Sequence, residues 1–141
     1  MSDPLTPAQM AATHAAGFTQ SRPWSALEFA ALLDSPLVFA AGDARCFALV
    51  RVIADEAELL TIATDPAHQR QGLARACMAE WESLACARGA AELFLEVAED
   101  NAPAKALYRV CGFAACGRRA GYYRRKDTNP ADAILMRKSL P

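Results

Sequence analysis

The chain has 141 residues, of which 53% are apolar and 22% are charged, and its formal net charge is −1. This composition is ordinary for a folded globular protein, and we expect one domain over residues 1–141. The near-neutral charge argues against direct nucleic-acid binding and against an anionic membrane partner, and no apolar run reaches the roughly 18 residues that span a bilayer.

The first predicted elements are two capped helices. The N-terminal stretch MSDPLTPAQ lacks the basic and apolar regions of a signal peptide, so we expect a cytoplasmic protein. Within this stretch, Thr6 followed by proline and Gln9 is typical of a helix N-cap, and predicts a helix that ends at Gly17. Residues 25–28 repeat the pattern and predict a second helix. Its expected buried face comprises Leu27, Ala30, Ala31 and Leu33.

Extended and helical patterns then alternate along the chain. Residues 37–42 and 44–54 are apolar runs separated by a Gly-Asp turn, which predicts a hairpin. Further strands are expected at 58–64, 92–98, 113–119 and 132–138, and further helices at 71–88 and from an Asn101 cap to Cys111. The order predicts an α/β (α+β) fold with a central mixed, mostly antiparallel sheet that helices flank on both faces.

The turn QRQGLAR, residues 69–75, stands between a predicted strand and a long helix. The first backbone N–H groups of a helix have no partner within the helix, so with the helix dipole they form an anion site. Gly72 would let the backbone approach the anion closely. Neither a Walker A loop nor a GxGxxG fingerprint is present. The turn is either a compact pyrophosphate cradle or simply a helix start with one glycine.

Glu96 interrupts the apolar run of residues 92–98. Strands inside a mixed sheet are usually apolar on both faces, and a buried, unpaired carboxylate would have a raised pKa that suits a general base. The alternative is a peripheral strand whose Glu96 simply faces water. The five cysteines contain no CxxC pair, so we expect small buried side chains and no metal site. His14 and His68 have no visible partner and are expected at the surface.

Two motifs resemble the GCN5-related N-acetyltransferase (GNAT) superfamily. Gln69-x-x-Gly72-x-Ala74 resembles the motif that binds the pyrophosphate of acetyl-CoA in that family. The stretch N-x-x-A-x-x-L-Y-x-x-x-G-F, residues 101–113, resembles a second signature. The resemblance implies acetyl-CoA as the acetyl donor, Asn101 as a contact of the coenzyme arm and Tyr108 as general acid. The implied coenzyme-binding residues are Ile62, Ala63, Thr64, Gln69, Arg70, Gln71, Gly72, Leu73, Ala74, Arg75 and Asn101. Alternatively, Tyr108 is a core aromatic.

Residues 22–138 resemble more specifically the RimI-type ribosomal-protein-alanine N-acetyltransferases. This resemblance implies that Glu96 is the base acting on a peptide α-amino group and that backbone N–H groups of residues 62–64 polarise the thioester carbonyl. It also places Tyr122 and Tyr123 in a loop over the peptide's N-terminal end, and implies that Trp24 contacts the substrate. The expected partner is the N-terminal peptide of a ribosomal protein, bound by a monomer without a metal.

Several alternatives remain open at this stage. The chain could instead acetylate a small-molecule amine, or bind acyl-CoA without catalysis; a pure binder, however, would need neither Glu96 nor Tyr108. The family usually has a short first strand before the first helix, and MSDPL is a poor candidate for it. Residues 118–126 contain five basic side chains, which form either a site for an acidic or RNA-linked partner or a charged hairpin that discourages edge pairing.

Overall fold

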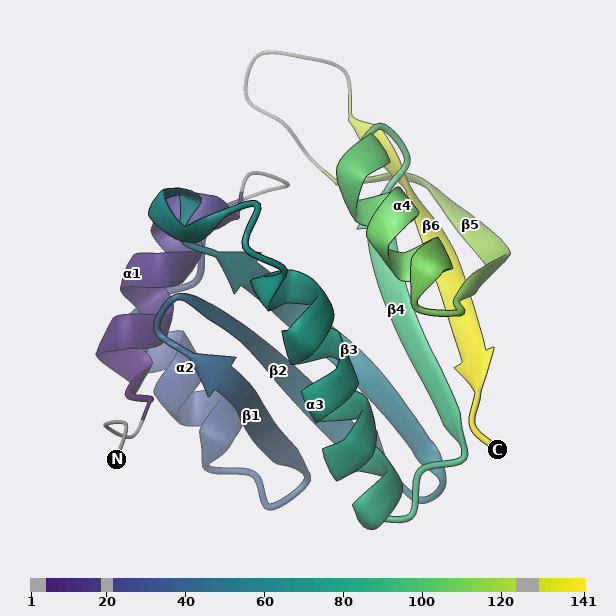
Figure 1. Ribbon diagram of the computed structural model, residues 1–141, viewed down its shortest axis with the longest axis horizontal. Helices are drawn as coiled ribbons and strands as arrows, with labels where there is room; N and C mark the ends of the chain where they lie inside the picture. The colour runs from purple at the N-terminus through teal and green to yellow at the C-terminus, as the bar shows by residue number, and fades with distance from the viewer. Residues whose placement is uncertain (1–4, 19–21, 124–129) are drawn as a thin grey trace.

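The computed structural model describes residues 5–18, 22–123 and 130–141, and shows one six-stranded sheet with helices on both faces (Figure 1). The strand order is β1-β2-β3-β4-β6-β5, and every neighbouring pair is antiparallel except β3 and β4. This confirms the expected fold class. The elements are α1 (Pro7–Gly17), α2 (Ala26–Leu33), β1 (Val38–Asp43), β2 (Cys46–Ile53), β3 (Glu56–Thr64), α3 (Leu73–Ala87), β4 (Glu92–Ala98), α4 (Ala102–Val110), β5 (Ala114–Tyr123) and β6 (Ala131–Ser139), with a short 3-10 turn at Pro66–His68. In the described part of the chain, no helix has the length and apolar character needed to cross a membrane.

Capping chemistry sets the starts of α1 and α2. Thr6 and Gln9 form a reciprocal capping box at α1, and Ser25 and Glu28 form another at α2, as predicted. The expected buried face of α2 was wrong: Leu27 is 83% exposed, whereas Phe29 is fully buried. Because the ring of Phe29 packs edge-on against Phe47 of β2, at 5.5 Å between centroids, that aromatic contact sets the rotation of the helix.

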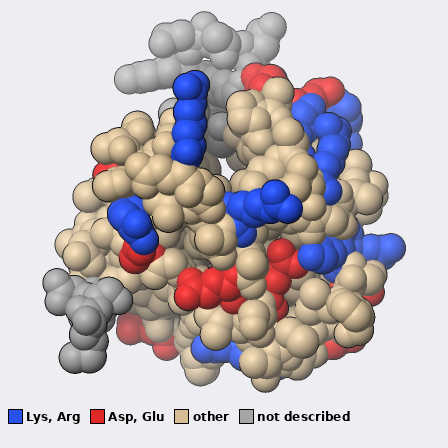
Figure 2. Space-filling view, in the orientation of Figure 1, with Lys and Arg blue, Asp and Glu red and all other residues tan. Residues whose placement is uncertain are grey.

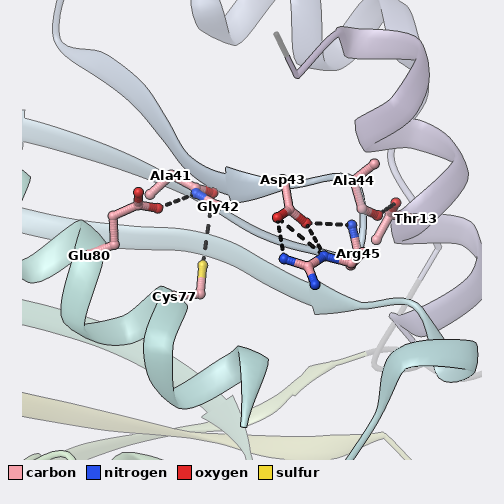
Figure 3. A network of polar contacts seen from close by, with 8 residues as sticks. All are labelled: Thr13, Ala41, Gly42, Asp43, Ala44, Arg45, Cys77 and Glu80. Carbon is pink, nitrogen blue, oxygen red and sulfur yellow. Dashed lines mark hydrogen bonds and ion pairs between the residues drawn. The ribbon is translucent and has the colours of Figure 1, made fainter. Parts of the chain in front are cut away.

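The β1–β2 hairpin turns at residues 44 and 45, two positions later than the Gly-Asp turn expected from the sequence. Asp43 accepts a hydrogen bond from the backbone N–H of Arg45 at 2.9 Å and forms an ion pair with its guanidinium at 2.7 Å. Thr13 of α1 donates to the Ala44 carbonyl at 2.5 Å (Figure 3). From the other face of the sheet, the Glu80 carboxylate of α3 accepts the Gly42 N–H. The hairpin end is therefore held by helices on both faces.

Strands β3 and β4 run parallel but pair over only three positions, from Glu56 opposite Glu92 to Glu58 opposite Phe94. Beyond these pairs the two strands diverge, as Figure 1 shows. β4 continues to pair with β6 over its whole length, whereas β3 follows β2 across an irregularity in the register at Leu49 and Val50. The divergence opens the sheet between β3 and β4, toward the start of α3 and α4.

Two hydrophobic clusters hold the helices to the sheet. The larger one lies beneath α3 and α4 and includes Trp81, which is fully buried. The smaller one lies beneath α1 and α2 and includes Met10 and Phe29. The cysteines only partly follow the expectation of burial, because Cys86 and Cys116 are exposed while Cys46 and Cys77 are buried. No strand precedes α1 in the described residues, and residues 1–4 of MSDPL, the poor candidate for the family's first strand, lie outside them.

Candidate functional site

A cavity of about 860 Å³ lies where β3 and β4 diverge. Figure 2 shows a hollow in the surface between α3 and α4, with basic side chains at its margin. The cavity wall combines the predicted site residues from six parts of the chain. Those that line it are Trp24, Ile62, Ala63, Thr64, Gln69, Ala74, Glu96, Asn101, Tyr108, Tyr122 and Tyr123. Residues predicted to bind the coenzyme, to catalyse the reaction and to bind the substrate thus line one cavity, which lies where β3 and β4 diverge.

The helix that follows the predicted pyrophosphate cradle begins at Leu73, two residues later than the expected start at residue 71. Gly72 is the N-cap residue, with φ +76°, and a Cβ added there would meet nothing within 4 Å. No side chain in the described part of the chain caps this end of α3, so its first N–H groups face outward without a protein partner. Of the motif, only Gln69 and Ala74 line the cavity; Arg70, Gln71, Gly72, Leu73 and Arg75 do not.

Glu96 lies in the middle of β4 and lines the cavity, with 26% of its side chain exposed. Strand β4 is an inner strand of the sheet, so the peripheral strand considered as an alternative is wrong. The carboxylate is also not unpaired: its Oε1 lies 3.2 Å from a guanidinium nitrogen of Arg119 on β5. This ion pair offsets the cost of placing a charge at the edge of the core.

Tyr108 lies on α4 and is 6% exposed, with its ring packed edge-on against Phe113 at 6.3 Å. It is a member of the larger core cluster and also lines the cavity, so the core interpretation and the site interpretation both describe it. Burial raises the pKa of the Tyr108 phenol well above its ordinary value, with a smaller contribution from Tyr123. The hydroxyl therefore keeps its proton at neutral pH. Asn101 caps α4 by accepting the Ala104 N–H at 3.3 Å.

Three aromatic side chains, those of Trp24, Tyr122 and Tyr123, also line the cavity. Tyr122 is half exposed and its ring meets that of Tyr123 edge-on at 5.2 Å. Both residues end strand β5, so their expected position in a loop was wrong, although both line the cavity. The extra length arises because β5 continues past an irregular register after Arg119. Trp24, just before α2, packs against Phe29 at 5.7 Å and reaches the same cavity.

His14 was expected at the surface and is instead fully buried, with its ring 5.2 Å from that of Trp24. Its Nδ1 accepts the backbone N–H of Trp24 at 2.9 Å, so its Nε2 carries the proton and donates to Thr61 Oγ1 at 2.9 Å. Burial lowers the pKa of His14 from its ordinary 6.5 to about 4. The imidazole thus joins α1, the segment before α2 and β3 as a neutral group. Its spacing of four residues from Met10 on α1 is the one local sequence signal that would have favoured an inward face.

The basic segment at 118–126 is partly described. Arg118 forms ion pairs with Glu99 at 2.8 Å and with Asp132 at 2.7 Å, and Arg119 pairs with Glu96. Arg124, Arg125 and Lys126 lie outside the described residues. The two described arginines therefore have partners within the chain, as expected of a charged hairpin. Within residues 5–18, 22–123 and 130–141, no group of three or more His, Cys, Asp or Glu side chains is placed to hold a metal ion.

Comparisons with known proteins agree with one another. The model of the acetyltransferase (GNAT) family matches residues 12–113. The ribosomal protein bS18-alanine N-acetyltransferase of Escherichia coli is 44% identical over 95 residues, which make up 67% of this chain and 64% of that protein. The N-alpha-acetyltransferase RimI of Mycobacterium tuberculosis is 45% identical over 83 residues, 59% of this chain and 49% of that protein. The chain thus matches less than two thirds of the length of these curated relatives.

Two solved structures extend the likeness. A crystal structure of a ribosomal-protein-alanine N-acetyltransferase from Escherichia coli superposes with a TM-score of 0.84 at 34% identity, and the match covers 94% of this chain and 86% of that one. The crystal structure of nourseothricin acetyltransferase superposes with a TM-score of 0.67 at 30% identity, over 75% of this chain and 67% of that one. The name of the first protein specifies a ribosomal protein as acceptor, and the name of the second specifies nourseothricin.

Proposed function

This chain belongs to the acetyltransferase (GNAT) family, and on that premise we propose that it moves an acetyl group from acetyl-CoA to the N-terminal α-amino group of a protein. The acceptor we propose is the N-terminal alanine of a small-subunit ribosomal protein, modified in the cytoplasm. The names of the sequence relatives support this acceptor, as does the superposition over 94% of the chain.

The observation that carries the proposal is that a base and an acid line one cavity. Glu96 enters it from β4 and Tyr108 from α4, and the cavity extends to Gln69 and Ala74 at the start of α3. Acyl transfer to an amine needs a group that accepts the proton of the amine and a group that protonates the leaving thiolate. A module that only bound acyl-CoA would need neither group.

The start of α3 fits the diphosphate of acetyl-CoA. The N–H groups of residues 73–75 have no capping side chain in the described part of the chain, and the helix dipole adds partial positive charge there. Open space at the missing Cβ of Gly72 lets an anion approach the backbone. Bound acetyl-CoA would supply an activated acetyl thioester, which residues 62–64 of β3 would meet inside the cavity.

The proposed roles use the carboxylate of Glu96 and the hydroxyl of Tyr108, which both line the cavity. The Glu96 carboxylate takes a proton from the acceptor's ammonium, directly or through water, and the ordinary α-amino pKa of about 8 makes this transfer easy at neutral pH. Tyr108, whose pKa is raised by burial, still holds its proton and gives it to the thiolate that leaves. Trp24, Tyr122 and Tyr123 also line the cavity, and we propose that they position the peptide's first residue.

A small amine is the second candidate acceptor, because nourseothricin acetyltransferase shares the fold at 30% identity. The purified protein is supplied with acetyl-CoA and either peptides of varied N-terminal residue or a panel of free amines. We expect turnover with alanine-terminated peptides. Turnover confined to the free amines would eliminate the peptide acceptor. We expect Glu96→Gln to lower kcat by about 10²- to 10⁴-fold and to leave acetyl-CoA affinity unchanged. Full activity in that variant would mean that Glu96 is only structural.

A further inference from the structure

The Glu96 carboxylate already has a cationic partner in the protein. Glu96 of β4 lies opposite Leu135 of β6, and Arg119 of β5 lies opposite Ala133 of the same strand. Since Leu135 and Ala133 are two residues apart, alternation places Glu96 and Arg119 on one face of the sheet. The guanidinium of Arg119 reaches across β6 to within 3.2 Å of Glu96 Oε1. It thus stands where an acceptor's ammonium group would meet the carboxylate.

This ion pair is exposed enough to exchange. The Arg119 side chain is 55% exposed and that of Glu96 is 26% exposed. Because the Arg119 end of the pair is largely exposed, and because an incoming cation leaves the Glu96 carboxylate paired, the guanidinium can be displaced at small cost. The guanidinium carbon also lies 5.4 Å from the ring centroid of Tyr122, which offers it a second favourable contact. Arg119 can therefore release Glu96 without losing every partner.

We propose that Arg119 limits the affinity of cationic acceptors by competing with their ammonium group for Glu96, an inference that rests on the proposed function. The charge of the acceptor depends on pH, because an α-amine loses its charge above about pH 8 and then no longer competes for the carboxylate. Removal of Arg119 should accordingly strengthen the binding of an ammonium group and not that of a neutral amine.

The charged and titratable surroundings of the pair come from four elements. The main cavity meets a smaller one of about 230 Å³, and both are lined by Glu58, Glu96 and Arg119. Glu58 of β3 pairs with Arg51 of β2 at 3.1 Å. The remaining titratable groups of the two cavities are Glu56, Tyr108, Tyr122 and Tyr123. All of these groups are the same in wild type and in an Arg119 variant, so a comparison at each pH isolates the guanidinium.

Three variants test the competition. Arg119→Gln removes the cation, Arg119→Lys keeps it, and Arg118→Gln is a matched control on the adjacent residue, whose partners are Glu99 and Asp132. Calorimetry measures the Kd of an alanine-terminated peptide for each protein saturated with CoA, from pH 6.5 to pH 9. Steady-state assays add kcat and both KM values. Thermal unfolding checks that every variant is folded.

We expect Arg119→Gln to bind the peptide about two- to fivefold more tightly at pH 6.5, with the advantage gone at pH 9, and with an unchanged KM for acetyl-CoA. Arg119→Lys and Arg118→Gln should behave as wild type. Equal or weaker binding by Arg119→Gln at pH 6.5, or an advantage that persists at pH 9, overturns the inference while acetylation by the wild type stands. A wild type that acetylates neither peptides nor free amines overturns the proposed function, and this inference with it.

Discussion

Buried His14 makes the stability of the fold depend on pH in a defined window. The folded protein holds this imidazole neutral, with a pKa of about 4, whereas in the unfolded chain it has its ordinary value of 6.5. Between these two values the unfolded state binds a proton that the folded state does not. The free energy of unfolding therefore falls as the pH is lowered through this window, and the loss is complete below about pH 4.

The size of the loss follows from the two pKa values. Each tenfold change in proton affinity corresponds to about 1.4 kcal/mol, so lowering the pKa of His14 from 6.5 to about 4 is worth at most about 3 kcal/mol. Most of it is already present at pH 5, where we expect a loss of about 2 kcal/mol relative to pH 7. His14 is 0% exposed, so solvent does not screen this effect.

Urea unfolding of the wild type and of His14→Gln at pH 7 and pH 5 measures the effect. Glutamine has no charged form, so the variant should lose about 2 kcal/mol less than the wild type between the two pH values, whatever its absolute stability. Carboxylates that titrate in both proteins cancel in the comparison. Equal pH dependence in the two proteins would refute the reasoning, because it would mean that His14 becomes protonated in the folded state at no cost.

Two further substitutions probe the cavity. Tyr108→Phe keeps the ring that packs on Phe113 and removes only the hydroxyl, so we expect kcat to fall about 10²-fold or more with little change in Tm; wild-type kcat would exclude Tyr108 as the acid. Gly17→Ala would place a Cβ 2.1 Å from the Thr64 carbonyl oxygen, so α1 would have to move away from β3. We expect the free energy of unfolding in urea to fall by about 1–3 kcal/mol. We also expect a higher KM for acetyl-CoA, because Thr64 lines the cavity. Unchanged values of both would show that α1 accommodates the methyl group.

Local chemistry made the helix starts predictable. Thr6, Ser25 and Asn101 each accept a backbone N–H within three residues, so a short sequence contains the whole signal. The α3 start was misplaced by two residues because Gly72 adopts a left-handed conformation, which no neighbouring residue type demands. The burial of His14 was missed because its partners, Trp24 and Thr61, lie 10 and 47 residues away.

The site depends on contacts that no local pattern contains. β3 and β4 come from segments separated by the whole of α3, and nothing in either strand shows that pairing stops after Glu58 and Phe94. The partner of Glu96 is equally non-local, because it is set by the register of both β4 and β5 on β6. Family resemblance supplied the candidate residues, whereas the ion pair with Arg119 required the structure.

The contact of Glu80 on α3 with the edge strand β1 affects the tendency of separate molecules to aggregate. An edge strand has unpaired backbone N–H groups, which can pair with a strand of another molecule and so begin aggregation. The Glu80 carboxylate accepts the Gly42 N–H, so a strand of another molecule would have to displace this carboxylate before it could pair with β1. Helix α3, which contributes Ala74 to the wall of the cavity, thereby also protects the edge of its own sheet.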